Sequence, residues 1–557
     1  MSTPQSATLS PGGAPVDRVG SNEKILFLAS FLTLIAAGMG FAIRGDIISD
    51  WGKQFGFTQG ELGIITGQGL AGFGLTIIFF SFFSDILGYG KLMVVAFLLH
   101  SLSVGLTLLA PYAFNQPSHM VDLGVFSFDI GGKMGAFNCL WAGAWAFSLA
   151  NGTCEAVINP LTATLFPKNK THWLNILHAG WPGGLVLGAL VGLVLNYLPK
   201  LGLPPVGWMI RWGIVIAPVL LYGLLMLGRP FPRSEAEASG VPFWRMAVTL
   251  LSPILLFLFL LHAMVGYVEL GTDTWIQNIT NTVLANKDWA LIAFIWTNVL
   301  MFTLRFFAGP IVHKISPVGL LFGSAVIGTT GLWMLGQPFT STIAMWMLAV
   351  TVYGIGKTFY WPTMLGVISE RYPQGGALVL GISGGIGMIS AGLLGGPGIG
   401  YKQDYFAAQS LQKADPGAYD RYKGDPKSPL TFVPEQYLPK VAGLDNAKVG
   451  VLDDNGAGLK EQLALTPEDK NLRQLDAWWQ QAKETAKSDK GPVDQATLYG
   501  GKRALEVTAV VPAAMAIGYL LLLLYFLAKG GYKAEVLVGH AANDEKFTGG
   551  TQGPGEG

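Results

Sequence analysis

The sequence predicts an all-α membrane protein in which twelve spanning helices form two six-helix bundles. Hydrophobic residues make up 51% of the chain, charged residues make up 13%, and the mean hydropathy is +0.44. A soluble protein of this size would carry roughly 25% charged residues. Apolar runs long enough to cross a bilayer recur about twelve times along the chain. A charged linker follows the sixth run, which is the pattern of two repeated halves.

The N-terminal half begins after a polar tail. Residues 1–24 are rich in Ser, Pro and Gly and are expected to form a disordered cytoplasmic tail. The apolar run that follows is about 20 residues long and has no small-residue cleavage pattern, so a membrane span is expected there rather than a signal peptide. An N-terminal bundle is expected over 25–228 and a cytoplasmic linker over 229–245. The six expected spans of this bundle are 25–43, 62–83, 92–110, 136–164, 174–197 and 209–228.

The C-terminal half is interrupted by a long polar block. Helices seven to eleven are expected over 246–400, helix twelve over 506–529, and a cytoplasmic tail over 530–557. The polar block between helices eleven and twelve, 401–505, is expected to be an extracytoplasmic insertion. The six expected spans of this half are 246–270, 289–308, 318–336, 343–366, 376–399 and 507–528.

Loop charges predict the orientation. Lys and Arg in short loops favour the side of the two termini by roughly threefold, so both termini are expected in the cytoplasm of a cell with the chain in its inner membrane. The insertion then lies outside. Its stripe of Leu472, Leu475, Trp478 and Trp479 has helical spacing, which predicts a small cap packed on the outer face. The alternative is a module that captures substrate or binds a partner.

Several function classes are excluded by what the sequence lacks. The net charge of +1 and the absence of a basic patch give no indication of nucleic-acid binding. Cys139 and Cys154 fall in one predicted span and cannot form a disulfide framework, so they are expected to be small core residues. No nucleophile–base set, metal-ligand spacing or phosphate loop is present, so no enzyme, metal site or cofactor is expected.

An acid at membrane depth indicates transport. Glu155 lies inside an apolar run, where an ionisable group costs roughly 2.5–3.5 kcal/mol and marks a functional site. Asn151, Glu155 and Asn159 share one helix face, which should line a cavity or the bundle interior. Burial favours the protonated carboxyl, so Glu155 is expected to couple transport to a proton, and the two amides are expected to bind substrate.

Two loop motifs point to a family. Asp85, Gly88 and Lys91 follow span two, where Gly permits a tight turn and the acid can face a helix terminus. A degenerate copy, Arg305 to Lys314, follows span eight at the equivalent place in the second half. Together with the twelve spans, these motifs resemble the major facilitator superfamily. The resemblance implies a transporter of that fold in which Asp85, Gly88, Lys91 and Arg305 serve gating or structure.

The run Glu155-Ala-Val-Ile-Asn159-Pro160 narrows the resemblance to the fucose/glucose–proton symporter branch. In that branch the acid of this motif is a protonation site, which implies the same role for Glu155. The run Gly45-Asp46-Ile-Ile resembles the branch's late first-helix acid and implies a proton or substrate role for Asp46. Gln68 falls where the branch tends to carry Gln, which implies a substrate contact. Arg44 is a possible partner of Asp46 or of a substrate.

The second half carries further candidate residues. Glu269 with Trp275 is similar to the seventh helix of sugar transporters, which implies that Glu269 binds substrate hydroxyls. Lys357 lies at membrane depth and needs a carboxylate partner, either Glu269 or Asp273. Lys357 is therefore expected to be either a substrate contact or part of a structural ion pair.

Tyr360 and Trp361 suit stacking on a sugar ring, although packing explains aromatic residues at this spacing equally well. Pro160, Pro182 and Pro362 are expected hinges.

Glu370 and Arg371 close span ten and are expected to gate the cytoplasmic side in a charge network with Asp85. The function expected from all these features is a monomeric, proton-coupled sugar symporter that works by alternating access. One alternative keeps the fold and changes the cargo to an organic anion, a nucleoside or an exported compound. The other is a non-transporting receptor or scaffold that uses the 401–505 domain.

Overall fold

The structure is a computed structural model that describes residues 20–57, 59–67, 69–122, 127–426, 428, 434–436, 438–465, 467, 469–535 and 537. Within this part of the chain, eleven helices are long and apolar enough to cross a membrane. Helix α5 (Gly132–Leu165) stands where the fourth span is expected and completes the set of twelve. The all-α membrane fold is therefore confirmed.

In the N-terminal half, α1 packs against α6 and α8, and α5 packs against α3 and α4. The α4–α5 connection adds a short antiparallel hairpin of β1 (Met120–Asp122) and β2 (Ser127–Asp129). Cys139 and Cys154 both lie in α5 as free thiols. The helices of this half besides α5 are α1 (Ser21–Phe55), α2 (Gln59–Gly67), α3 (Gly69–Leu87), α4 (Tyr89–Phe114), α6 (Lys170–Tyr197), α7 (Trp208–Gly213) and α8 (Ile216–Met226).

The C-terminal half repeats this arrangement. Its tenth span breaks at Thr358–Phe359, between α15 and α16, and its eleventh contains a π-helical turn at Ala391–Gly395. The helices of this half are α11 (Pro253–Leu284), α12 (Lys287–Arg305), α13 (Ala308–Ile315), α14 (Pro317–Gly336), α15 (Ile343–Lys357), α16 (Tyr360–Arg371), α17 (Gly376–Ser390), α18 (Gly396–Ala414), α23 (Ala486–Thr508) and α24 (Val510–Ala528).

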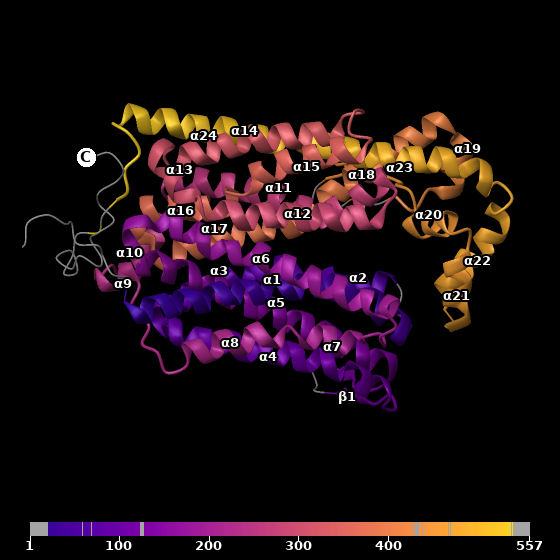
Figure 1. Ribbon diagram of the computed structural model, residues 1–557, viewed down its shortest axis with the longest axis horizontal. Coiled ribbons are helices and arrows are strands. Elements are labelled where there is room, and N and C mark those ends of the chain that lie inside the picture. The colour runs from indigo at the N-terminus through magenta and orange to yellow at the C-terminus, as the bar shows by residue number, and fades with distance from the viewer. Residues whose placement is uncertain are drawn as a thin grey trace, which may run out of the picture.

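The two ends of the bundle differ (Figure 1). The linker helices α9 (Glu235–Ala238) and α10 (Phe243–Thr249) lie at one end, which we call the linker side. The insertion lies at the opposite end, the insertion side. Its short helices are α19 (Pro416–Tyr422), α20 (Asn446–Asp453), α21 (Ala457–Leu465) and α22 (Lys470–Ala482).

Several helices run past their expected ends. Helix α11 continues to Leu284 rather than 270, α18 continues to Ala414, and α23 begins at Ala486 rather than near 506. Polar outer turns carry no hydropathy signal, but α18 and α23 pack against each other and so remain helical. The block 401–505 therefore begins and ends as a two-helix stalk.

The insertion has a hydrophobic core of its own. The predicted stripe packs there, with Trp479 buried and Leu472, Leu475 and Trp478 packed against the same core. Leu411 of α18 and Val493 of α23 belong to this core as well. The stalk and the short helices therefore form one folded unit.

The two halves meet most closely where α3 crosses α17. A Cβ built on Gly74 would lie 2.7 Å from the carbonyl oxygen of Gly385, which is inside van der Waals contact. Small residues let helix backbones approach in this way inside a membrane. The close contact fixes how the two bundles face each other and so shapes the space between them.

Candidate functional site

A cavity of about 610 Å³ lies between the two halves. Helices α1, α3 and α6 line one wall, and α11 and α12 line the other. The lining combines two carboxylates, two amides and three aromatic rings with small and aliphatic residues. The polar and aromatic lining residues are Asp46, Asp273, Asn196, Gln277, Thr274, Phe41, Trp181 and Phe294.

Asp46 lines this cavity and pairs with Arg211 from α7. Nη1 of Arg211 lies 2.7 Å from Oδ2 of Asp46, and Nη2 contacts Asp50. The amide of Asn196 donates to Oδ1 of Asp46 at 2.8 Å. The carboxylate is thus fixed in place by a fork-shaped cation and a neutral donor.

Arg44 does not pair with Asp46. Its Cζ lies 4.8 Å from the ring centroid of Phe147 and 5.3 Å from that of Trp212. The guanidinium is buried between these rings, and cation–π attraction compensates part of its lost hydration. Arg211, not Arg44, is the partner of Asp46.

Across the cavity, Asp273 pairs with Lys357. Nζ of Lys357 contacts Oδ1 of Asp273 and lies 5.6 Å from the ring centroid of Tyr353. Of the two carboxylates that the sequence offers to Lys357, the structure pairs it with Asp273. Two acids, one from each half, therefore face the cavity with their cations behind them.

Glu155 lies on the linker side of the cavity in a chain of hydrogen bonds. Nδ2 of Asn159 donates to Oε2 of Glu155 at 2.5 Å, and Oδ1 of Asn159 lies 2.9 Å from Nε2 of His178. Since the amide nitrogen faces Glu155, His178 donates through Nε2 to the amide oxygen. All three side chains are buried.

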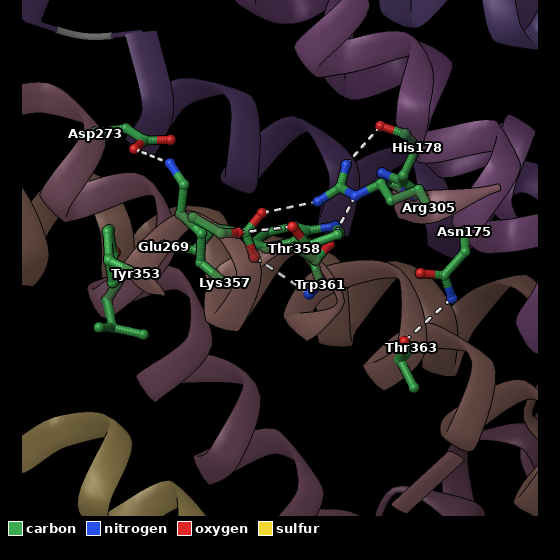
Figure 2. Close-up of polar contacts among 12 residues, drawn as sticks. Asn175, His178, Glu269, Asp273, Arg305, Tyr353, Lys357, Thr358, Trp361 and Thr363 are labelled. Atoms are coloured by element: carbon green, nitrogen blue, oxygen red, sulfur yellow. Dashed lines mark hydrogen bonds and ion pairs between the residues drawn. The ribbon is translucent and has the colours of Figure 1, made fainter. Parts of the chain in front are cut away.

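Glu269 and Arg305 form a buried ion pair (Figure 2). Nη2 of Arg305 lies 3.1 Å from Oε1 of Glu269, and Oε2 of Glu269 accepts from the backbone N–H of Trp361 at 3.2 Å. Arg305 also donates to the carbonyl oxygens of Thr358 and His178. Arg305 lies inside the expected eighth span and ends α12 in the protein interior.

Asp46, with its expected proton or substrate role, lines this cavity, but the other predicted substrate residues that the structure describes lie outside its lining. Asn151 bonds His100 at 3.0 Å, the hydroxyl of Tyr360 donates to the carbonyl of Ser324 at 3.1 Å, and Trp361 packs edge-on against His262. Asn159 bonds Glu155, Glu269 pairs with Arg305, and Lys357 pairs with Asp273. Gln68 lies outside the described residues.

The linker side is closed by contacts between the halves. Asn175 of α6 donates to Thr363 of α16 at 3.1 Å, and Lys170 pairs with Glu235 of the linker at 2.5 Å. Arg371 pairs with Glu535 of the C-terminal tail at 2.8 Å, so the expected network of Arg371 with Asp85 is wrong.

The first loop motif lies at the same end. Asp85 instead faces Gly376, where a Cβ would meet its Oδ2 at 3.3 Å at the N-terminus of α17. Gly88 has a φ of 81°, so the turn uses a conformation that glycine favours, and Lys91 lies exposed beside it.

Sequence reasoning missed several residues of the cavity and one of the cations behind it. Arg211, which pairs with the cavity carboxylate of Asp46, falls in the sixth apolar run, where a basic residue is itself a signal. Asn196 and Trp181 lie on α6 facing the cavity, and Gln277 lies on α11 beyond the expected end of its span. The neutral residues carried no such signal, because amides and aromatics are common at helix mouths.

Comparison with known proteins identifies the family. Residues 26–396 match the family described as the Major Facilitator Superfamily. A cis,cis-muconate transport protein of Acinetobacter baylyi is 26% identical over 228 residues, which is 40% of this chain and 48% of that protein. The chain thus matches about half the length of that relative.

Two solved structures share the fold. The fucose:proton symporter of E. coli has a TM-score of 0.53 at 16% identity, with 69% of this chain and 93% of that chain covered. A bacterial homologue of the human lysosomal transporter Spinster has a TM-score of 0.54 at 15% identity, with 90% and 97% covered. Because the family match extends over most of both halves, the chain belongs to the Major Facilitator Superfamily of membrane transporters.

Proposed function

We propose that this transporter is a proton-coupled sugar symporter and that the cavity between its halves is the sugar site. The observation that carries the proposal is the lining of that cavity. Carboxylates and amides accept and donate hydrogen bonds to hydroxyl groups, and the faces of Trp181 and Phe41 suit the apolar face of a sugar ring. A volume of about 610 Å³ is ample for a monosaccharide with water.

The positions of the charged groups relative to the cavity favour a neutral solute. The side chains of Asp46 and Asp273 are 24% and 15% exposed, whereas those of their partners Arg211 and Lys357 are 9% and 1% exposed. A solute in the cavity therefore meets the carboxylates before the cations. Hydroxyl groups can donate to these carboxylates, but an anion would be repelled by them.

Glu155 is the proposed proton site, with Asp46 as a second candidate. The Glu155 carboxyl is buried, and in the described part of the chain its side-chain partner is the neutral amide of Asn159 rather than a cation. A proton binds while the cavity faces outward and leaves when inward opening hydrates the carboxyl. One proton crossing 100 mV supplies roughly 2.3 kcal/mol for accumulation.

Uptake from a panel of labelled neutral sugars into proteoliposomes, with and without an inward proton gradient, tests this proposal. We expect at least one sugar to accumulate only when the gradient is present. Accumulation that requires sodium at symmetric pH would refute proton coupling, and binding of no neutral sugar would refute the substrate class.

An organic anion is the second candidate. It is favoured by the similarity to the cis,cis-muconate transport protein of Acinetobacter baylyi. Such a substrate would have to displace Asp273 from Lys357 to gain a positive partner. Thermal shift with dicarboxylates beside neutral hexoses separates the two, since stabilisation by dicarboxylates alone would support the anion.

In the proposed orientation, both termini and the linker side lie in the cytoplasm and the insertion lies outside. The protein is proposed to work as a monomer and to take its substrate up. The rival function is a receptor that works through the insertion. Uptake that persists after removal of the short helices of the insertion, α19 to α22, would refute it.

A further inference from the structure

Two prolines free two backbone carbonyls near the centre of the protein. Pro182 lies inside α6 and has no N–H, so the carbonyl of His178, four residues earlier, lacks its helical donor. Pro362 likewise has no N–H to donate to the carbonyl of Thr358, four residues earlier, where the tenth span breaks between α15 and α16. Both sites are buried, where an unpaired carbonyl costs free energy comparable to a lost hydrogen bond.

One side chain satisfies both carbonyls (Figure 2). Nη1 of Arg305 donates to the carbonyl of His178 at 2.6 Å, and Nε donates to the carbonyl of Thr358 at 2.8 Å. The remaining nitrogen, Nη2, binds Glu269. All three nitrogens of the guanidinium are therefore engaged, in the fork geometry that a lysine cannot reproduce.

The bond to His178 joins the two halves of the transporter. His178 belongs to the N-terminal half, whereas Arg305, Thr358 and Glu269 belong to the C-terminal half. A third proline gives a contrast, because the carbonyl of Ala156 freed by Pro160 accepts from Ser84 at 3.3 Å within one half. The Ser84 contact can persist through a movement of one half against the other, but the Arg305 contact cannot.

We propose that Arg305 is the positioning residue that holds the closed linker side. It makes its bond to the proline-freed carbonyl of His178 when that side is closed and breaks the bond when that side opens. The charged and titratable groups around it are Glu269, Asp273 and Lys357 from its own half, and His178 and His262 beside them. The inference rests on the alternating access of the proposed function, but not on a sugar or a proton.

Spin labels on the linker side test the proposal. Asn169→Cys and Lys314→Cys are exposed positions in opposite halves, and Cys139→Ser with Cys154→Ala removes the native thiols. Pulsed electron paramagnetic resonance on protein in nanodiscs without substrate then reports the distance between the halves. Arg305→Lys should shift the distribution to longer distances. Pro182→Ala should act in the same direction, because an alanine there restores the helical N–H donor to the His178 carbonyl and competes with Arg305.

Pro160→Ala is the matched control, since it removes a proline whose carbonyl is bonded within one half. It should leave the distances unchanged. The double variant of Arg305→Lys with Pro182→Ala should move no further than the larger single effect, because both changes weaken one bond.

Unchanged distances in folded Arg305→Lys and Pro182→Ala overturn the proposal, and so does an equal shift in Pro160→Ala. If Arg305→Lys fails to fold, Pro182→Ala alone decides, since it keeps every polar side chain. Uptake assays on the same samples distinguish failure of this proposal from failure of the proposed substrate. If the distances shift as expected but the parent protein takes up no sugar, only the sugar assignment is refuted.

Discussion

Glu370 accepts two hydrogen bonds from Thr171, a residue 199 positions earlier in the chain and in the other half of the protein. Its Oε1 lies 2.5 Å from the hydroxyl of Thr171 and 3.2 Å from the backbone nitrogen. The contact needs the small residue Gly366, where a Cβ would lie 2.3 Å from the Thr171 hydroxyl. The start of α6 is thus bound to the end of α16, and this contact holds the linker side shut.

Removing the Thr171 hydroxyl should open that side. Hydrogen bonds to charged groups contribute about 1.5–3 kcal/mol, so Thr171→Val should shift the balance toward the open state by roughly 10- to 100-fold. A cysteine at Ala163, buried at this end of α5, reports the change as faster reaction with a membrane-impermeant thiol reagent. Thr329→Val is the control, because that hydroxyl donates to the carbonyl of Ala325 in its own helix.

The C-terminal tail supports the same contact through the other oxygen of Glu370. The hydroxyl of Tyr532 donates to Oε2 at 2.9 Å, and the backbone N–H of Glu535 donates to the Glu370 carbonyl at 2.7 Å. Tyr532→Phe should therefore also speed the reaction of the cysteine in Ala163→Cys with the thiol reagent, but by less than Thr171→Val does. Labelling rates equal to those of the parent protein would mean that the tail does not hold the gate.

The sequence predicted the helices better than the contacts. Twelve spans, the central linker and the acid at Glu155 carry strong signals, because a charge in an apolar run is rare. The pairing of Lys357 with Asp273 instead of Glu269 depends on which turn of α11 faces α15, and periodicity leaves two acids on one face. The contacts of Arg305 carry no sequence signal, because two of its three partners are backbone carbonyls far away along the chain.

Glu155→Gln tests proton coupling most directly. Glutamine keeps the size and the hydrogen bond to Asn159 but cannot lose a proton, so accumulation against a gradient should be lost. Counterflow exchange of labelled for unlabelled sugar should continue, because it needs no net proton movement. Uphill uptake that survives in this variant would remove Glu155 from the coupling role.

The Asp273–Lys357 pair allows the proposed sugar site to be changed without leaving an unpaired buried charge. Asp273→Asn alone leaves the buried Lys357 uncompensated and should cost about 3–5 kcal/mol of stability. Adding Lys357→Met should restore most of that loss, since apolar replacement of a buried pair is often neutral. The double variant should fold but bind sugar more weakly, visible as a raised KM at similar melting temperature. An unchanged KM would place the sugar elsewhere.

The insertion depends on a partly buried ion pair between its stalk and α19. Arg421 binds Asp489 through two nitrogens, at 2.8 and 2.5 Å, and the Asp489 side chain is only 1% exposed. Arg421→Ala leaves this carboxylate buried with only the Thr485 hydroxyl at 2.7 Å, which should cost about 3–5 kcal/mol of local stability. Limited proteolysis should then cleave the insertion faster.

Lys423→Ala is the matched control, because its pair with Asp420 is exposed and worth about 0–1 kcal/mol. Cleavage should stay at the parent rate in this variant. Sugar uptake should persist in Arg421→Ala if the cap only covers the bundle. Uptake that falls in step with cleavage would show instead that the folded insertion takes part in transport.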